Sequence, residues 1–172
     1  MKTSFVIREA TKADAHDMAV VFVRSWQSAY RGIVPDDYLA SLSIKKRAER
    51  IINDFDEHER KLFYYVAEKD DEIIGCIVLS ECRNEDKSNA GEVLAIYLFE
   101  EYWDKGYGRK MMEHAINVFR RIGYEETVVW VLEENLKARR FYEKLGFTFD
   151  GTKTELEKGK VLSVIRYTMS IR

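Results

Sequence analysis

A turn that contains two glycines has residue types suited to a chemical task. Residues 101–109 read EYWDKGYGR, between a predicted strand and a predicted helix. The first turn of a helix leaves backbone N–H groups unpaired, and the helix dipole adds positive potential there. Because Gly106 and Gly108 have no Cβ, a phosphate can approach this backbone closely, and neighbouring Lys and Arg side chains add charge. A tight turn that needs glycines for steric reasons alone is the alternative interpretation.

Dinucleotide-binding and Walker-type phosphate loops do not match this turn. A dinucleotide fingerprint needs a third glycine, and Met111 stands in that place. A Walker loop needs a Gly-Lys-Ser/Thr sequence, which does not follow Gly108. The turn therefore predicts a site for a pyrophosphate without identifying the molecule that carries it.

A second pattern occupies residues 135–147, which read NLKARRFYEKLGF. Asn135 is a good helix N-cap, Gly146 is a typical helix end, and the apolar residues between them fall on one face. A capped amphipathic helix explains these features, but the pattern N-x-x-A-x-x-F-Y-x-x-x-G-F is more specific than capping requires. It resembles the second signature of the GNAT superfamily of N-acetyltransferases. The glycine turn resembles the first signature of that superfamily, Q/R-x-x-G-x-G/A.

The resemblance to this superfamily covers the chain from Phe5 to Arg172, with the two signatures in the right order and at the right spacing. One position departs from the first signature, since Trp103 stands where the family has Gln or Arg. Family members hold the pyrophosphate mostly with backbone N–H groups. We therefore expect the change to remove one side-chain contact and to leave cofactor binding otherwise intact.

The resemblance implies direct transfer of an acetyl group from acetyl-CoA to an amine, through a ternary complex. In the family, the fourth and fifth strands splay apart, and the pantetheine arm of the cofactor lies between them like an added strand. The pyrophosphate lies on the glycine turn, and a residue at the far strand end contacts the arm. The residues implied in cofactor binding are Ile96, Tyr97, Leu98, Trp103, Asp104, Lys105, Gly106, Tyr107, Gly108, Arg109, Lys110 and Asn135.

The resemblance also suggests residues for proton transfer. Tyr142 matches the tyrosine that often protonates the leaving thiolate, which a phenol within hydrogen-bond reach can do. An inward-facing core aromatic is the alternative for this residue. The amine must lose a proton before it attacks, and most amines are protonated at neutral pH. Glu92 resembles the carboxylate base of some members, with an exposed strand-end charge as the alternative, and Glu133 and Glu134 are weaker candidates.

The acceptor is expected to bind near the first two helices and their connection, as in the family. Residues 26–38 read WQSAYRGIVPDDY, and aromatic rings together with carboxylates suit a cationic amine. Trp26 and Tyr30 are the candidate substrate-binding residues. Helix packing is the alternative for Trp26, and a solvated helix cap is the alternative for Asp36 and Asp37. The pattern W-x-x-A-Y-x-G-x-x-P-x-x-Y-L-x-x-L-S resembles that of a bacterial subgroup of the family. This resemblance does not identify a substrate.

Strand and helix patterns alternate along the chain and would position these residues. Strands are predicted over residues 5–8, 62–68, 73–81, 93–99, 127–132, 147–155 and 161–170. Helices are predicted after Thr11, Ser43, Gly108 and Asn135, with a short helical turn after Pro35. The fold class is therefore α/β of the α+β kind, a mixed and mostly antiparallel sheet of about seven strands flanked by about four helices. The resemblance adds the splay between strands four and five.

The composition excludes several classes of protein. The chain has 172 residues, 46% of them hydrophobic and 34% charged, which fits a single domain over residues 1–172. A net charge of −2 lacks the basic excess of a nucleic-acid-binding protein, and no apolar run is long enough to span a bilayer. The three histidines show no metal-ligand spacing. Two cysteines make no disulfide framework, and Cys76 and Cys82 are interpreted as buried strand residues.

The N-terminal residues turn polar too early for a signal peptide, so we expect a cytoplasmic protein. Many family members dimerise, and the resemblance therefore makes a homodimer an expectation. Other functions stay open: a non-catalytic acyl-CoA-binding or sensing domain, a protein-interaction module on the same fold, or an acetyltransferase for peptide or protein N-termini. The sequence does not identify the acceptor amine, the base, the oligomeric state or the physiological role.

Overall fold

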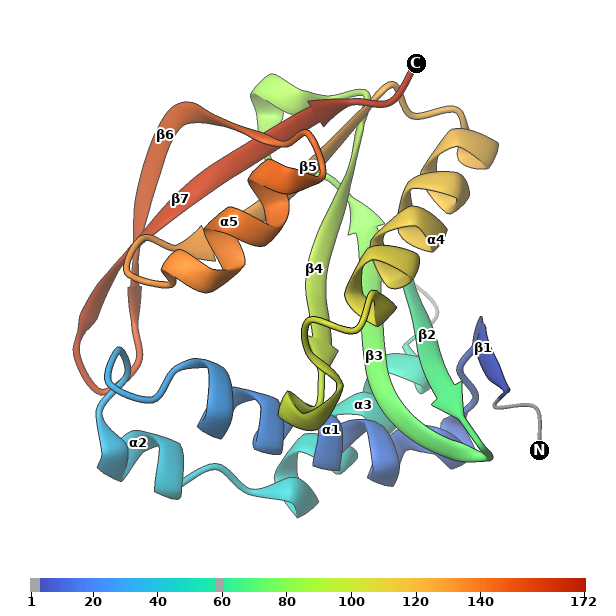
Figure 1. Cartoon of the computed structure of the whole chain (residues 1–172), viewed down its shortest axis with the longest axis vertical. Coiled ribbons are helices and arrows are strands. Elements are labelled where there is room, and N and C mark those ends of the chain that lie inside the picture. The colour runs from blue at the N-terminus through green and yellow to red at the C-terminus, as the bar shows by residue number, and fades with distance from the viewer. Residues whose placement is uncertain (1–3, 58–60) are drawn as a thin grey trace.

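The computed structural model describes residues 4–57 and 61–172, and its strands join in one seven-stranded sheet (Figure 1). The strands are β1 (Phe5–Glu9), β2 (Leu62–Lys69), β3 (Glu72–Glu81), β4 (Ala90–Leu98), β5 (Glu126–Leu132), β6 (Thr148–Glu157) and β7 (Val161–Ser170). The helices are α1 (Ala15–Ala29), α2 (Asp36–Ala40), α3 (Ile44–Asp56), α4 (Tyr107–Ile122) and α5 (Leu136–Lys144).

The strand order is β1-β2-β3-β4-β5-β7-β6, and among the described strands only β4 and β5 pair in parallel. The prediction of a mixed, mostly antiparallel sheet is thereby confirmed. Residues 1–3 of the predicted polar N-terminus and His58 lie outside the described residues. No helix in the described part of the chain combines the length and apolar character that a bilayer crossing requires.

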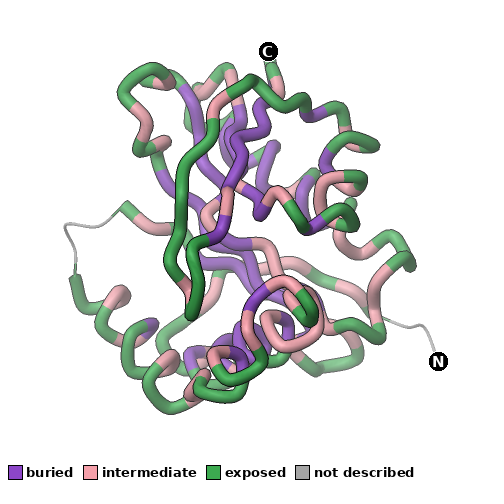
Figure 2. Tube along the Cα trace, turned by 90° about the vertical axis from the view of Figure 1, so that its left-hand side faces the viewer, coloured by how far each residue is buried: buried purple, intermediate pink, exposed green. Residues whose placement is uncertain are grey.

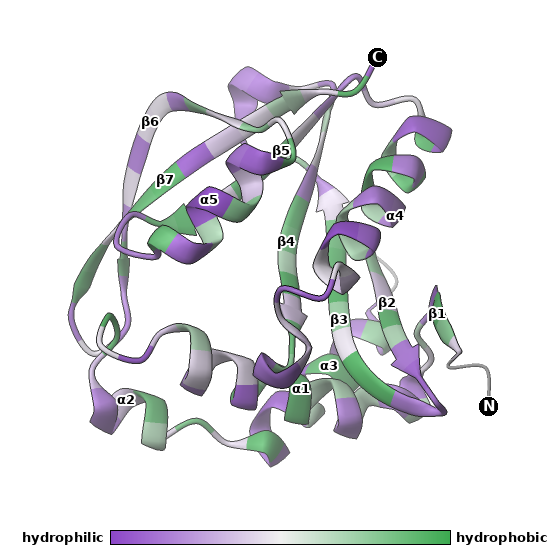
Figure 3. Cartoon of the chain, viewed as in Figure 1, coloured by the Kyte–Doolittle hydropathy of each residue, from purple (hydrophilic) through white to green (hydrophobic). Residues whose placement is uncertain are grey.

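Helices cover both faces of the sheet. α4 and α5 pack over one face, where Met112 and Phe119 belong to the larger cluster of buried side chains. α1 and α3 pack over the other face, around Met18 and Ile51. Figure 2 shows the buried residues gathered in the interior, and Figure 3 shows hydrophilic residues on the outer turns of α4 and α5. The central strands β3 and β4 are therefore covered on both sides, which matches their nearly continuous apolar sequences.

Capping residues place the ends of the helices where the sequence predicts them. The Ser43 side chain accepts a hydrogen bond from the backbone N–H of Lys46 at 3.2 Å, which caps α3. The Asn135 side chain accepts one from the N–H of Ala138 at 3.2 Å, which caps α5. Gly123 adopts the left-handed conformation, with φ 103°, directly after α4. These local signals are the reason that the helix boundaries could be read from the sequence.

The pairing of β4 with β5 ends early, and this opens the sheet. Val93 pairs with Val129, and no later pair joins the two strands in the described residues. At the same point β4 has a β-bulge, because successive residues of β3 pair with Val93 and Ala95 and leave Leu94 as the extra residue. A bulge bends its strand, so β4 leaves β5 from this residue onward. The predicted splay of strands four and five is confirmed.

β4 begins at Ala90, earlier than the predicted residue 93. Ala90 and Gly91 look like loop residues in the sequence. In the structure Gly91 pairs with Thr127 of β5 and lies directly against Phe119 of α4. A Cβ at residue 91 would lie 2.3 Å from Phe119 Cδ1. The small residue therefore allows a close approach of α4 to the sheet, a requirement that strand propensity does not reveal.

We predict that Gly91→Ala lowers the free energy of unfolding by about 2 kcal/mol, because the added methyl group overpacks the contact with Phe119. Urea unfolding followed by tryptophan fluorescence measures this change. In a Phe119→Ala background the same substitution should cost clearly less, since alanine lacks Cγ, Cδ1 and Cε1, the atoms that would clash. An equal cost in the two backgrounds would contradict the proposed contact.

Candidate active site

A cleft of about 870 Å³ lies where β4 and β5 separate. Residues 93–98 of β4 line one wall, and residues 129–131 of β5 line the opposite wall. α1, the loop between β4 and α4, and α5 complete the lining. Beyond Val93, the side of β4 that faces β5 pairs with no strand in the described residues. Its backbone groups there are available to an extended ligand.

One side of the cleft is strongly basic. The loop before α4, the first turn of α4 and the adjacent face of α5 supply the charged lining residues, which are Asp104, Arg109, Lys137, Arg140 and Lys144. Asp104 is the only carboxylate among the described lining residues, and it forms an ion pair of 3.0 Å with Lys137. Four cations against one carboxylate suit a ligand with several negative charges, such as a phosphorylated molecule.

The glycine turn has steric reasons for both of its glycines. Gly106 has φ 84°, a left-handed conformation that most side chains disfavour, and α4 begins at the next residue. A Cβ on Gly106 would meet no atom within 4 Å, so the space beside the turn is open. At Gly108 a Cβ would lie 3.3 Å from the Phe141 ring, so this glycine also lets α5 pack against the first turn of α4.

Trp103 is the residue that departs from the first signature. Its side chain connects the turn to the end of β4. Its indole Nε1 donates a hydrogen bond of 2.8 Å to the carbonyl oxygen of Leu98. The same oxygen accepts a second hydrogen bond, 3.3 Å long, from the Ser25 hydroxyl. The Leu98 carbonyl, in a segment implied to pair with the cofactor, is therefore already engaged by two side chains.

The structure brings most of the predicted cofactor-binding residues to the cleft. Those that line it are Ile96, Tyr97, Leu98, Trp103, Asp104, Gly106, Gly108, Arg109 and Asn135. Three others do not line it. Tyr107 packs on Phe5 with ring centroids 4.8 Å apart, and Lys110 lies over the same ring at 5.4 Å. Lys105 lies over the Tyr102 ring, at 5.8 Å.

Apart from Arg109, the positive charge beside the turn comes from residues that the sequence analysis did not select. The predicted Lys105 and Lys110 do not line the cleft, whereas Lys137, Arg140 and Lys144 line it. Their spacing of three and four residues puts them on one side of α5, next to its apolar inner face. That spacing was visible in the sequence, but the direction in which α5 faces the glycine turn depends on the tertiary structure.

Tyr142 lies in the cleft wall and is 7% exposed. Its ring packs against Phe141, Phe147 and Tyr167, with centroid distances of 5.3, 5.8 and 6.3 Å. Burial, with a smaller contribution from Tyr97, raises the pKa of the Tyr142 phenol well above its ordinary value. The residue is thus a core aromatic and a protonated cleft phenol at once, which leaves it able to donate a hydrogen bond at neutral pH.

The two predicted acceptor-side residues belong to one aromatic group. Tyr30 lines the cleft, whereas Trp26 does not and instead packs edge-on against Tyr30 at 4.8 Å. The Trp26 indole donates a hydrogen bond of 2.8 Å to the hydroxyl of Tyr97, which does line the cleft. Burial is the main reason that the pKa values of Tyr30 and Tyr97 are raised. Asp36 and Asp37 are exposed on α2 and are not lining residues.

Glu92, the candidate base, is not a lining residue of the cleft. Gly91 faces α4, so the next residue points to the opposite face of the sheet. There Glu92 is 1% exposed, and its carboxylate accepts hydrogen bonds from Arg83 Nη2 at 2.6 Å, Arg83 Nε at 3.1 Å and Arg83 N at 3.2 Å. Neither an exposed strand-end charge nor a carboxylate free to take a proton describes this placement, which favours a structural ion pair.

The other candidate residues, Glu133 and the two cysteines, do not line the cleft. Glu133 binds Lys153 at 2.5 Å and the Ser163 hydroxyl at 2.7 Å, and the bond from Lys153 is the main cause that lowers its pKa. Burial raises the pKa of the Cys76 and Cys82 thiols, which opposes formation of a thiolate nucleophile. No cluster of metal-ligating side chains occurs among residues 4–57 and 61–172.

Comparisons with known proteins agree with this arrangement. The sequence profile of the Acetyltransferase (GNAT) family matches residues 22–147. An uncharacterized N-acetyltransferase of Bacillus subtilis, YuaI, is 31% identical over 129 residues, which make up 75% of this chain and 72% of the relative. A spermidine N(1)-acetyltransferase of Thermoplasma acidophilum is 28% identical over 152 residues, 87% of this chain and 91% of that protein.

Solved structures show the same fold. The PaiA N-acetyltransferase of Thermoplasma acidophilum, in complex with coenzyme A, superimposes with a TM-score of 0.77 and 24% sequence identity. The match covers 95% of this chain and 98% of that one. At this level of identity the comparison establishes the fold of the chain rather than its ligand.

We predict that Arg83→Ala lowers the free energy of unfolding by about 2 kcal/mol, because it leaves the buried Glu92 carboxylate without its main partner. The Arg83 side chain is 70% exposed, so water takes over part of its role and the full cost of a buried unpaired charge is not reached. Urea unfolding at neutral pH measures the loss. The double variant Arg83→Ala/Glu92→Gln has no charge to bury and should be more stable than Arg83→Ala; the reverse order would contradict the ion-pair role.

Proposed function

The chain belongs to the acetyltransferase (GNAT) family, and we propose that it transfers an acetyl group from acetyl-CoA directly to the amine of an acceptor molecule. The observation that carries the proposal is the cleft between β4 and β5. One side of this cleft is basic, the other side is aromatic, and Tyr142 lies in its wall. We disfavour a non-catalytic acyl-CoA-binding domain, because the Tyr142 phenol in the cleft wall keeps a proton that it could donate.

The residues of the cleft fit acetyl-CoA, a long molecule with an extended pantetheine arm and phosphate groups. The unpaired edge of β4 offers backbone groups to an extended arm. The open space beside Gly106 and the start of α4 suit a pyrophosphate, with Arg109 nearby. Lys137, Arg140 and Lys144 would add charge-assisted contacts to phosphates. Asn135 lines the cleft but uses its side-chain oxygen to cap α5, so a contact through its amide nitrogen is the one left to a ligand.

Acetyl-CoA, when bound, supplies an acetyl group activated as a thioester. The protein's task is then to admit a neutral amine and to provide a proton for the departing sulfur. Tyr142 keeps its proton on Oη at neutral pH, and we assign it the role of proton donor. No carboxylate other than the ion-paired Asp104 and no imidazole lines the cleft in the described residues. The proton of the amine is therefore proposed to leave through water or before the amine enters, rather than to Glu92.

The acceptor is proposed to be a small-molecule amine. A relative that bears the name spermidine N(1)-acetyltransferase and aligns with 87% of this chain supports this class. An acetyltransferase for peptide N-termini stays the alternative, since an N-alpha-acetyltransferase 30 of Schizosaccharomyces pombe is 27% identical over 90 residues. We also propose that residues 1–172 form one domain, because one sheet runs from β1 to β6.

Calorimetric titration with acetyl-CoA tests the proposal first, with NAD as the comparison ligand. Micromolar affinity for acetyl-CoA together with CoA release in the presence of amines is the expected result. A folded protein that binds no acetyl-CoA would overturn the proposed function and leave only the family assignment. Binding without release of CoA in a broad amine screen would favour the sensing alternative.

The double charge reversal Arg140→Glu/Lys144→Glu should raise the dissociation constant for acetyl-CoA by roughly tenfold, because two cations of the cleft become anions that repel phosphates. Calorimetry at low ionic strength measures the change. The matched control is Lys45→Glu/Lys46→Glu on α3, which alters the net charge equally on the other face of the sheet. A similar loss of affinity in the control would show that only the overall charge matters.

Tyr142→Phe should lower kcat by about 10²-fold and leave the acetyl-CoA dissociation constant unchanged, because it removes the proposed acid and keeps the ring packing. The control is Tyr167→Phe, since the Tyr167 hydroxyl binds Glu143 and Arg139 and the residue does not line the cleft. Full turnover by Tyr142→Phe would return Tyr142 to a purely structural role.

A further inference from the structure

The acceptor half of the cleft is built from uncharged residues. We use this name for the part lined by Ser25, Ser28, Ala29, Tyr30, Tyr97, Trp130 and Tyr142. Tyr30 and Trp130 also pack against a small apolar cluster that connects α1 and α2 with β5 and β7, formed by Val34, Leu39, Leu132, Leu162 and Val164. The two residues are only partly buried in that cluster, so they present ring surface to the cleft. This half therefore offers aromatic faces and hydroxyl groups, without a formal charge.

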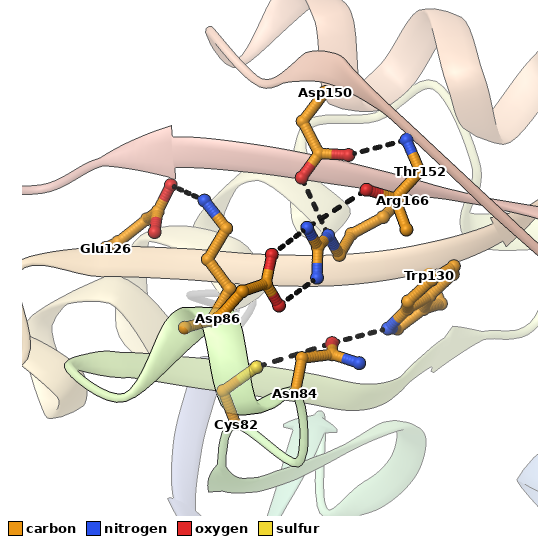
Figure 4. A network of polar contacts seen from close by, with 9 residues as sticks. Cys82, Asn84, Asp86, Glu126, Trp130, Asp150, Thr152 and Arg166 are labelled. Atoms are coloured by element: carbon orange, nitrogen blue, oxygen red, sulfur yellow. Dashed lines mark hydrogen bonds and ion pairs between the residues drawn. The ribbon is translucent and has the colours of Figure 1, made fainter.

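Trp130 is a lining residue that the sequence analysis did not select, and two polar contacts hold it. Its indole Nε1 donates a hydrogen bond of 3.2 Å to Asn84 Oδ1, in the loop between β3 and β4. The guanidinium carbon of Arg166 on β7 lies 5.7 Å from the centroid of its ring. Figure 4 shows Trp130, Asn84 and Arg166 converging from β5, the loop and β7. The indole is thus fixed from two directions, which makes it suited to orient a ligand.

Arg166 is buried, and two carboxylates bind its guanidinium group. Asp150 accepts from Arg166 Nε at 2.7 Å, and Asp86 accepts from its two terminal nitrogens at 2.8 and 2.5 Å (Figure 4). Glu92 is likewise bound by Arg83. No carboxylate occurs among the described lining residues around Trp130, so a second ammonium group there would lack an anionic partner.

A contact between the β6–β7 hairpin and α2 lies outside the residues that line the cleft. The tip of the β6–β7 hairpin packs on the segment before and within α2, where a Cβ on Gly159 would lie 3.0 Å from the Cβ of Tyr38 and 3.3 Å from Pro35. Lys158 lies over the Tyr38 ring at 6.0 Å. Gly159 has φ 72°, a conformation that favours glycine. The glycine therefore suits both the turn and the close contact. The contact joins the β6–β7 hairpin to α2, and these elements also supply Leu162 and Leu39 to the apolar cluster beside Tyr30 and Trp130.

We infer that the acceptor is a small molecule with a single amine on an aromatic or apolar body, and that Trp130 is a specificity-determining residue for it. The inference rests on the proposed function. An aromatic body gains from stacking and from burial of apolar surface against Trp130 and Tyr30. A polyamine would bring further ammonium groups into a half without carboxylates, where their loss of hydration is not compensated. Asn84 is a positioning residue, since it acts only through the indole.

Initial-rate measurements of CoA release with 2-phenylethylamine and with spermidine test the substrate class. We expect kcat/KM for 2-phenylethylamine to exceed that for spermidine by at least tenfold. Equal or better use of spermidine would overturn the inference and leave the proposed function intact. Failure of both amines would overturn it as well. Parallel titration with acetyl-CoA separates this failure from failure of the proposed function, which alone predicts cofactor binding.

Variants test the role of Trp130 directly. Trp130→Leu should raise KM for 2-phenylethylamine about tenfold and leave the acetyl-CoA dissociation constant unchanged. Asn84→Ala should raise the same KM, and Asn84→Asp should rescue it because it keeps an oxygen to accept from the indole. Phe63→Leu, which replaces an exposed ring on β2, is the matched control and should have no effect on KM. An unchanged KM in Trp130→Leu would overturn the assignment.

Discussion

The end of strand pairing at Val93 and Val129 is the feature on which the other properties of the site depend. Up to this pair, β4 and β5 form a normal parallel ladder, and beyond it the bulge at Leu94 turns β4 away. An unpaired strand edge inside a sheet leaves backbone groups without partners, which is unfavourable unless a ligand or water satisfies them. The same break provides the cleft, its backbone donors and its separate walls.

Contacts on both faces of the sheet fix the strands next to this break. α4 anchors β4 through the contact of Phe119 with Gly91, where any larger residue would force the helix outward. On the other side, the buried Arg166 ties β6 and β7 to the loop between β3 and β4 through Asp150 and Asp86. Removing these charges from water costs free energy, and the binding of both carboxylates by one guanidinium group offsets part of that cost.

The cleft divides the chemistry between its two halves. Cations from α4 and α5 gather on the side of the glycine turn, whereas the acceptor half has only aromatic rings and hydroxyl groups. Tyr142 belongs to this uncharged half, and its burial among other rings keeps its phenol protonated. Charged residues can therefore bind the phosphates of the cofactor while apolar contacts select the acceptor. The two ligands then use different residues of the cleft.

The sequence by itself determined the elements and the two signatures, since caps such as Ser43 and Asn135, terminal glycines such as Gly123 and apolar periodicity act between near neighbours. Tyr142 and Tyr30, which the resemblance singled out, both line the cleft. Only the tertiary structure decided that Glu92 is bound by Arg83, that the charge beside the turn comes from α5 rather than Lys110, and that Trp130 faces the cleft. These outcomes depend on which strand face and which helix side meet, and such contacts between distant residues leave no periodic signal in a single sequence.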